Sequence, residues 1–173
     1  MSKIEDYLSQ SPELMPSVVG YILQGNEVLL GERLTSSTDL GIKLLVGLGG
    51  GREMGETDEE AFNREVLEES SLTVLRSQDM GQVIFIFPDK PKWTQRVKIF
   101  LVKEDNWHGK PKKTASIKPV WVASSELPFN RMWPDNAIWV PEVLKGNKVN
   151  GIFLLDLDGN ILEQQFEVLP ENS

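Results

Sequence analysis

The acidic segment over residues 50–72 constrains this chain more than any other feature. Eight of the residues between Glu53 and Glu69 are aspartate or glutamate. Thr57, followed three residues later by Glu60, forms a capping box, which predicts that a helix begins just after Thr57. Acidic residues in the first turn also suit the positive end of a helix dipole. The segment is therefore expected to be a helix that holds its charges in a fixed arrangement.

Three glutamates of this helix are spaced to converge. Glu65, Glu68 and Glu69 stand at positions i, i+3 and i+4, so their carboxylates share one side of the helix. Like charges at this spacing repel, and Mg²⁺, which binds such carboxylates together with substrate phosphates, removes that cost. The alternative is a solvated acidic face, the usual origin of a charge run. Phe62 and Val66, four residues apart, are expected to face the core.

The spacing of the segment resembles the Nudix box, G-x5-E-x7-R-E-U-x-E-E-x-G-U, in which U is a bulky aliphatic residue. The residues in register are Gly50, Glu56, Arg64, Glu65, Val66, Glu68, Glu69 and Leu72. Ser71 stands where the family has glycine. If the backbone is left-handed at this position, serine costs about 1 kcal/mol.

The resemblance implies a cofactor and a catalytic set. Mg²⁺, with Mn²⁺ as a substitute, is expected on Glu65, Glu68 and Glu69. Arg64 is expected to pair with Glu56 and to fix the preceding loop against the helix.

A glycine-rich run over residues 47–51 precedes the helix. Glycine lets the backbone come close to a partner. In the Nudix pattern this run is a loop whose carbonyl groups approach the metal, so the Gly49 carbonyl is an expected ligand. A flexible turn is the alternative.

Composition restricts the class of protein. A chain of 173 residues predicts one domain, here residues 16–173, with residues 1–15 as an extension that is either a short helix or loose. The net charge of −8 excludes a polymeric nucleic-acid partner. No apolar run approaches 18 residues, and the acidic N-terminus lacks a signal-peptide core, so no membrane partner is expected. The absence of cysteine fits a cytoplasmic protein. A monomer is expected, with a dimer as the alternative.

Strand and helix patterns predict a mixed sheet with helices on both faces. Strands are expected at residues 17–23, 27–31, 43–46, 83–87, 96–102 and 120–123, with a loop at 35–39. A second helix is expected at 134–145, and a hairpin at 151–157 and 161–168. Periodicity alone gives an α/β or α+β class, and the resemblance implies the Nudix α/β/α sandwich.

Beyond the box, the chain resembles the mammalian MutT-homologue branch of the family, the oxidised-purine nucleoside triphosphatases. The similar segments are 28–31, 81–87, Met132-Trp133-Pro134-Asp135-Asn136, and the pair Trp139 and Pro141. The resemblance implies a pyrophosphohydrolase that cleaves purine nucleoside triphosphates to monophosphate and pyrophosphate and thereby clears damaged nucleotides before DNA synthesis.

Aromatic and polar side chains of these segments predict a purine pocket. Trp133 offers a face for a base to stack on, and Phe85 and Phe87 share one face of a strand. Asp135 is expected to hydrogen-bond the base edge, as a donor too if burial keeps it protonated. The alternatives are core packing for Trp133 and helix capping for Asp135.

Four pocket positions depart from this branch. Asn136 replaces a second Asp, Val46 an Asn, Val18 a Thr and Arg33 a Lys. These changes leave a purine as the expected substrate, while the preferred base stays open.

A fifth departure affects the catalytic residues. Ser116 occupies the place of a downstream Glu. Without this Glu, the carboxylates of the box are either sufficient for catalysis or give a weaker activity. His108, the one histidine, is an alternative catalytic base. A non-catalytic nucleotide-binding module, or a hydrolase of another nucleoside diphosphate-linked compound, are the competing functions.

Overall fold

The structure is a computed structural model that describes residues 2–37 and 43–170. Its large sheet contains β1 (Met15–Gln24), β2 (Glu27–Ser37), β3 (Lys43–Val46), β4 (Leu48–Gly51), β6 (Gln78–Ile86), β7 (Gln95–Val102), β9 (Ile117–Ala123), β10 (Val149–Leu155) and β11 (Ile161–Val168). A second, two-stranded sheet contains β5 (Thr73–Val74) and β8 (Trp107–His108). The helices are α1 (Lys3–Leu8), α2 (Asp58–Ser70) and α3 (Asn136–Leu144), with 3-10 turns η1 (Pro91–Trp93), η2 (Glu104–Asn106) and η3 (Phe129–Arg131).

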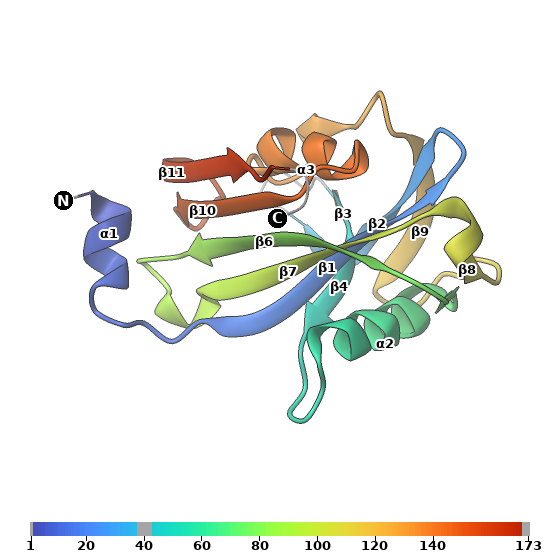
Figure 1. Ribbon diagram of the computed structural model, residues 1–173, viewed down its shortest axis with the longest axis horizontal. Helices are drawn as coiled ribbons and strands as arrows, with labels where there is room; N and C mark the ends of the chain where they lie inside the picture. The colour runs from blue at the N-terminus through green and yellow to red at the C-terminus, as the bar shows by residue number, and fades with distance from the viewer. Residues whose placement is uncertain (1, 38–42, 171–173) are drawn as a thin grey trace.

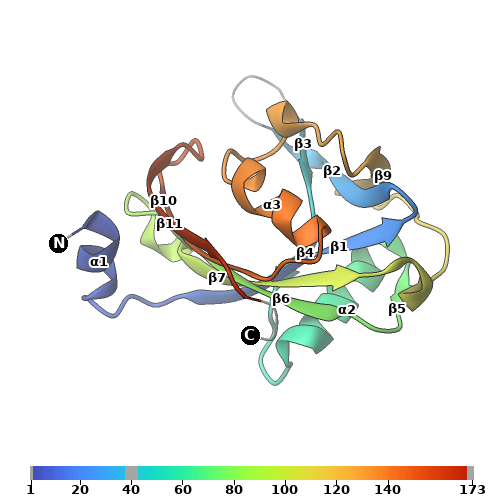
Figure 2. The ribbon, with the colours of Figure 1, turned by 45° about the horizontal axis from the view of Figure 1, so that its top comes forward.

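The large sheet is mixed, as the sequence predicts. Its order is β11-β10-β6-β7-β1-β2-β3, with β4 also paired to β1 and β9 to β2. The β1–β7 and β6–β10 pairs are parallel, whereas the other pairs are antiparallel. Helices α2 and α3 lie on opposite sides of the sheet (Figures 1 and 2). The expected arrangement of helices on both faces is therefore confirmed.

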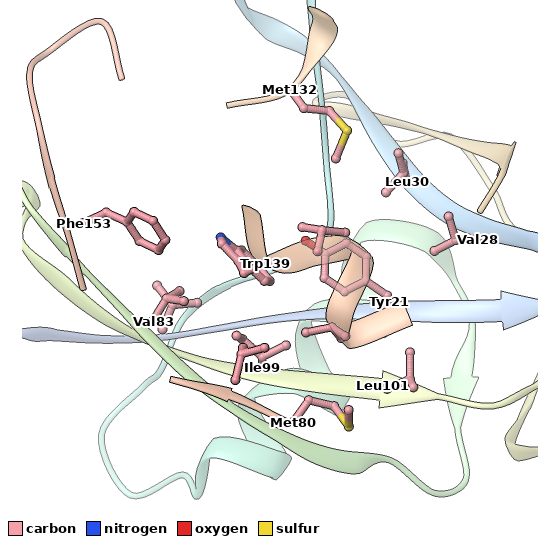
Figure 3. Close-up of a cluster of buried hydrophobic side chains, with 14 of the residues drawn as sticks. Tyr21, Val28, Leu30, Met80, Val83, Ile99, Leu101, Met132, Trp139 and Phe153 are labelled. Atoms are coloured by element: carbon pink, nitrogen blue, oxygen red, sulfur yellow. The ribbon is translucent and has the colours of Figure 1, made fainter. Parts of the chain in front are cut away.

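An apolar core fills the space between the sheet and α3. Figure 3 shows Trp139 reaching from α3 toward Tyr21 and Val83 of the sheet. The rings of Tyr21 and Trp139 meet edge to face at 6.1 Å. Each buried aromatic side chain contributes a few kcal/mol to folding, so this core fixes α3 over the sheet.

A second core lies between the sheet and α2. Phe62 and Val66 are fully buried there, as the sequence predicts, and the Phe62 ring stacks on Phe100 at 5.0 Å. A Cβ atom on Gly20 would lie 2.3 Å from the Phe62 ring, so glycine at this point of β1 makes room for the helix. The packing fixes the side of α2 that carries its glutamates.

The residues ahead of β1 fold as a helix that docks on the sheet. Ser2 caps α1 in a capping box with Glu5, and fully buried Ile4 packs against Ile86 and Leu154. Of the two conformations that the sequence allows for this segment, the helix is the correct one. None of the helices within residues 2–37 and 43–170 is long and apolar enough to cross a membrane.

Several predicted boundaries are wrong. The glycine run is not a loop, because Leu48–Gly51 pairs with β1 as strand β4. The loop expected at residues 35–39 is partly strand, since β2 continues to Ser37, and the rest falls among residues 38–42, which lie outside the described part. Strand β6 ends at Ile86, one residue earlier than expected. The β10–β11 hairpin is confirmed.

Candidate active site

Helix α2 begins and ends as its sequence predicts. The Glu60 N–H donates to Thr57 Oγ1 at 3.1 Å, and the Thr57 N–H donates back to Glu60 Oε1 at 3.0 Å. At the other end Ser71 has φ 66° and ψ 12°, a left-handed conformation in which serine costs about 1 kcal/mol relative to glycine. The helix stops there, two residues beyond Glu69.

Strand β4 lies directly against the glutamates of α2. The Gly49 N–H donates to Glu69 Oε1 at 2.7 Å. A Cβ atom on Gly49 would lie 2.0 Å from the Val18 carbonyl oxygen, and one on Gly50 would lie 2.7 Å from the Glu65 carboxylate. The run is therefore rich in glycine because its backbone approaches both β1 and the helix carboxylates.

Arg64 joins three parts of the site. Its guanidinium donates to both carboxylate oxygens of Glu56 and, through Nη2, to the Gly51 carbonyl at 3.0 Å. Nη1 donates to Glu65 Oε1 at 2.9 Å and to Glu68 Oε2 at 3.3 Å. The hydrogen bond with Glu56 raises the pKa of Arg64 and lowers that of Glu56. The predicted Arg64–Glu56 pair is present and ties residues 51–56 to the helix.

The carboxylates of α2 repel one another in a partly buried place. Burial, followed by the charges of Glu65 and Glu68, raises the pKa of Glu69 to about 7, against the opposing effects of the Gly49 N–H and Arg33. Burial also raises the pKa of Glu65, although Arg64 opposes it. The charged forms of Glu65 and Glu69 are therefore not fully compensated by nearby positive groups.

These side chains fit a hard dication by their chemistry. Two half-buried carboxylates with raised pKa values and a third beside them are the oxygen donors that Mg²⁺ prefers. Within the described residues, no three acidic or histidine side chains are already gathered as a ready-made metal site. Glu65 and Glu68 are instead held by Arg64, and Glu69 is held by the Gly49 N–H.

A cavity of about 380 Å³ lies on the α3 side of β4. Its walls include every side chain that the sequence predicts for substrate binding: Arg33, Val46, Phe85, Phe87, Trp133, Asp135 and Asn136. Gly49, Gly50 and Gly51 also line it. Strand β4 is therefore common to the cavity and to the glutamates of α2.

Asp135 is buried in this cavity and oriented by its neighbours. It is 1% exposed, and its Oδ2 atom accepts from Trp139 Nε1 at 2.8 Å and from Asn136 Nδ2 at 3.0 Å. Burial raises the pKa of Asp135, although both hydrogen bonds oppose this effect. Asp135 occupies the N-cap position of α3, but within the described chain its side chain makes no capping hydrogen bond, so its carboxyl group does not serve as a helix cap.

Trp133 lies at the cavity wall and not in the core. It is 36% exposed. Behind it stands Gly159, in the turn between β10 and β11, where a Cβ atom would lie 2.2 Å from Trp133 Cε3. One side of the indole is thus backed by the main chain of this turn, and the core-packing interpretation is wrong.

Sequence reasoning missed part of the cavity wall. The missed residues are Ser17, Val19, Tyr21, Gly47, Trp93, Gln95, Val97, Trp139 and Leu155; Val18, already noted as a departure, lines it too. Gln95 pairs with Phe85 across β6 and β7, so the signal for it was the strand register. The signal for Trp139 was its spacing four residues after Asp135, which places both on one side of a helix.

Ser116 and His108 lie apart from the cavity wall. Ser116 is exposed just before β9, and its carbonyl accepts the Leu34 N–H at 2.9 Å. His108 is exposed in β8, paired with Thr73 beyond the end of α2. Neither is among the residues that line the cavity in the described structure.

Comparison with known proteins identifies the family. The model of the NUDIX domain matches residues 13–143, which is most of the chain. The chain belongs to the Nudix family. This Nudix chain is 31% identical over 150 residues to the oxidized purine nucleoside triphosphate hydrolase of Danio rerio, covering 87% of this chain and 92% of that one. It is 32% identical over 141 residues to the Mus musculus protein of the same name, covering 82% and 86%.

Solved structures confirm the Nudix fold. The MutT protein of Bacillus halodurans superposes with a TM-score of 0.75 at 19% identity, covering 89% of this chain and 98% of that one. The ORF135 protein of E. coli superposes with a TM-score of 0.61 at 17% identity, covering 79% and 92%. The Nudix α+β fold with a mixed sheet, expected from the sequence, is thus correct.

Proposed function

We propose that this Nudix hydrolase is a Mg²⁺-dependent pyrophosphohydrolase of purine nucleoside triphosphates, including oxidised or otherwise modified purines. The observation that carries the proposal is the position of β4, which lines an aromatic cavity and also contacts Glu65 and Glu69. A nucleotide with its base in the cavity has its phosphates close to the carboxylates. The names of the relatives support a purine triphosphate as the substrate.

The cavity suits a base more than any other part of a nucleotide. Its volume of about 380 Å³ lies at the lower end of the usual range for ligand pockets. Stacking on Trp133 is worth about 1–3 kcal/mol. Asp135, held by Trp139 and Asn136, offers a carboxyl group that can accept or, when protonated, donate a hydrogen bond to the base edge.

The phosphates are expected at the β4 end of the cavity. Arg33 is exposed there and acts electrostatically on Glu69, so its guanidinium is placed to pair with a phosphate. Glu65, Glu68 and Glu69 would hold Mg²⁺ or Mn²⁺, with the Gly49 carbonyl as a further ligand. When bound, the cation neutralises phosphate charge and acidifies a water molecule.

The rest of the reaction falls to side chains of α2. Residues 114–117 contain no acid, so the box carboxylates of α2 are proposed to suffice for activating the attacking water. Glu69, whose pKa burial and neighbouring charges raise to about 7 in the metal-free protein, would gain most from the charge of a bound cation. Arg64 fixes the direction of Glu65 and Glu68. Attack at phosphorus releases a nucleoside monophosphate and pyrophosphate.

The test is a panel of nucleotides with products identified by mass. The purified protein with Mg²⁺ is expected to release monophosphate and pyrophosphate from purine triphosphates, natural and 8-oxo forms, and much less from pyrimidine ones. Glu69→Gln should abolish turnover. Glu59→Gln, the same change at an exposed residue of α2, should leave it intact.

Three outcomes contradict the proposal. Turnover of none of the purine triphosphates, with equal results for wild type and Glu69→Gln, removes the catalytic role of α2. Calorimetric binding of nucleotide without turnover indicates a non-catalytic module. Cleavage confined to nucleoside diphosphate-linked compounds assigns a different substrate class.

A further inference from the structure

The segment that joins β6 to β7 supports one side of the base cavity. Trp93 of η1 and Gln95 of β7 both line the cavity, and Phe87, just beyond the end of β6, lines it too. The Phe87 and Trp93 rings meet edge to face at 5.7 Å. Thr94, between the two lining residues, is fully buried.

The polar groups of Thr94 connect three separate segments. Its Oγ1 accepts the Phe87 N–H at 3.1 Å, and its N–H donates to the Pro91 carbonyl at 3.1 Å, which closes η1. Its carbonyl accepts the Met15 N–H at 3.0 Å, at the start of β1. Its Oγ1 also lies 3.4 Å from the Tyr7 hydroxyl of α1. A single buried threonine thus holds η1, the end of β6 and the N-terminal segment together.

The hydroxyl of Thr94 replaces a missing strand partner. Because β6 ends at Ile86, the Phe87 N–H lies beyond the strand ladder and donates to Thr94 Oγ1 instead. This hydrogen bond is part-buried, so the N–H would be left without a partner at a cost if the hydroxyl were removed. Without the hydroxyl, Phe87 would shift to find water, and Trp93, which packs on it, would shift as well.

Helix α1 holds Tyr7 at the other end of this connection. The Glu163 carboxylate of β11 accepts the N–H groups of Lys3 and Ile4, both at 3.1 Å. The Ile4 side chain is fully buried against the sheet. These contacts hold α1 against the sheet and thereby place the Tyr7 hydroxyl beside Thr94.

We infer that Thr94 is a positioning residue for the base cavity, supported by Tyr7 of α1. It acts through Phe87, Trp93 and Gln95 and touches no substrate atom itself. The inference rests on the proposed function only in so far as the cavity binds a base. The hydrogen bonds of Glu69 and Arg64 involve none of these residues, so the effect should fall on binding and not on the chemical step.

The first measurement is the separation of KM from kcat. With a purine triphosphate substrate, Thr94→Val should raise KM about 3- to 10-fold, the worth of one hydrogen bond, with kcat within about twofold. Thr94→Ser, which restores the hydroxyl, should return KM to near the wild-type value. Tyr7→Phe should raise KM by about two- to threefold, and it keeps the inference testable if Thr94→Val does not fold.

The matched control is Thr114→Val. Thr114 Oγ1 also accepts a backbone N–H at 3.1 Å, from Ile117, but Thr114 does not line the cavity in the described structure. This variant should leave KM unchanged. Equal loss of thermal stability in Thr94→Val and Thr114→Val, with KM unchanged in both, would overturn the inference. Parallel loss of kcat in Thr94→Val would overturn it as well.

The second measurement needs no activity and so separates this inference from the proposed function. Amide hydrogen exchange at Phe87 should be slow in the wild type, faster in Thr94→Val and slow again in Thr94→Ser. Unchanged exchange at Phe87 in Thr94→Val would refute the role of the hydroxyl, whatever substrate the protein has. A wild-type protein that binds no purine but shows this pattern would refute the proposed function while leaving the support of the cavity wall by Thr94 intact.

Discussion

Replacing Gly159 by alanine tests whether Trp133 is the surface on which the base stacks. Gly159 has φ +83° and lies behind the indole, where a new Cβ atom would be 2.2 Å from Cε3 and 2.4 Å from Cζ3. The turn itself cannot easily retreat, because Asp156 Oδ1 accepts the N–H groups of Asp158 and Asn160, both at 2.9 Å. Trp133, being partly exposed, must move instead.

Two separate costs follow from this substitution. A left-handed backbone costs a residue with a Cβ atom about 1–2 kcal/mol, which lowers Tm by about 2–8 °C in a domain of this size. Displacement of Trp133 removes base stacking worth about 1–3 kcal/mol. The second cost should appear as purine binding about 5- to 150-fold weaker, with kcat little changed.

Gly146→Ala separates the two costs. Gly146 has a similar φ of +92°, but a Cβ atom there would meet no other described atom within 4 Å. Both variants should therefore melt earlier, measured by thermal denaturation, while only Gly159→Ala should raise the purine KM toward that of Trp133→Ala. Equal KM values for Gly159→Ala and Gly146→Ala, at equal loss of Tm, would refute the assignment of Trp133.

Three further predictions follow from the pKa shifts and the strained residue. In the metal-free protein the pKa of Glu69 is about 7, against 4.5 for the free side chain, so its contribution to stability is complete below about pH 4.5 and is lost as pH rises through 7. Thermal melts from pH 5 to 8.5 should show this decline in Tm. An equal decline of Tm with pH in Glu69→Gln would count against it. Ser71→Gly should raise Tm by about 2–4 °C, since it relieves about 1 kcal/mol of left-handed strain, and an unchanged melt would contradict that cost. Trp139→Phe removes a hydrogen bond that lowers the pKa of Asp135, so purine KM should stay low to a higher pH than in the wild type. A purine KM that is instead high at low pH and falls as pH rises would show that Asp135 binds the base in its charged form.

The part of the site on α2 was predictable because its determinants are local. The capping box at Thr57 and Glu60 fixes where the helix begins. The spacing of Glu65, Glu68 and Glu69 places them on neighbouring positions of that helix, although their carboxylates are not gathered as a metal site within the described residues. These facts require no knowledge of the rest of the fold.

The glycine run could not be interpreted correctly from local signals. Glycine is disfavoured in strands, so residues 47–51 predict a loop. Residues 48–51 nevertheless form β4. Glycine is required at Gly49, where a Cβ atom would lie 2.0 Å from the Val18 carbonyl oxygen, and it gives room at Gly50, where a Cβ atom would lie 2.7 Å from the Glu65 carboxylate. That requirement arises from packing between distant segments, which a sequence does not display.

In the cavity, too, some residues were predictable from local signals and others depend on contacts between distant segments. Trp133, Asp135 and Phe85 were predicted through resemblance and strand alternation, whereas Gln95 and Tyr21 depend on how β1, β6 and β7 pair. Register across a sheet is set by long-range contacts, so the sequence alone did not predict that Gln95 and Tyr21 line the cavity.

The two ends of the site are therefore free to change independently. The carboxylates and Arg64 belong to one helix and the strand beside it, and their hydrogen bonds involve no cavity aromatic residue. The base end is assembled from η1, the β10–β11 turn and the start of α3, through Trp93, Trp133 and Asp135. We expect a substitution in η1 or in that turn to alter which base fits without moving the glutamates, since the two ends are connected through the main chain of β4 and through Arg33, which lines the cavity and acts electrostatically on Glu69. Val46 and Asn136, which depart from the branch pattern that the sequence resembles, both line the cavity, and we expect changes there to alter specificity without loss of catalysis.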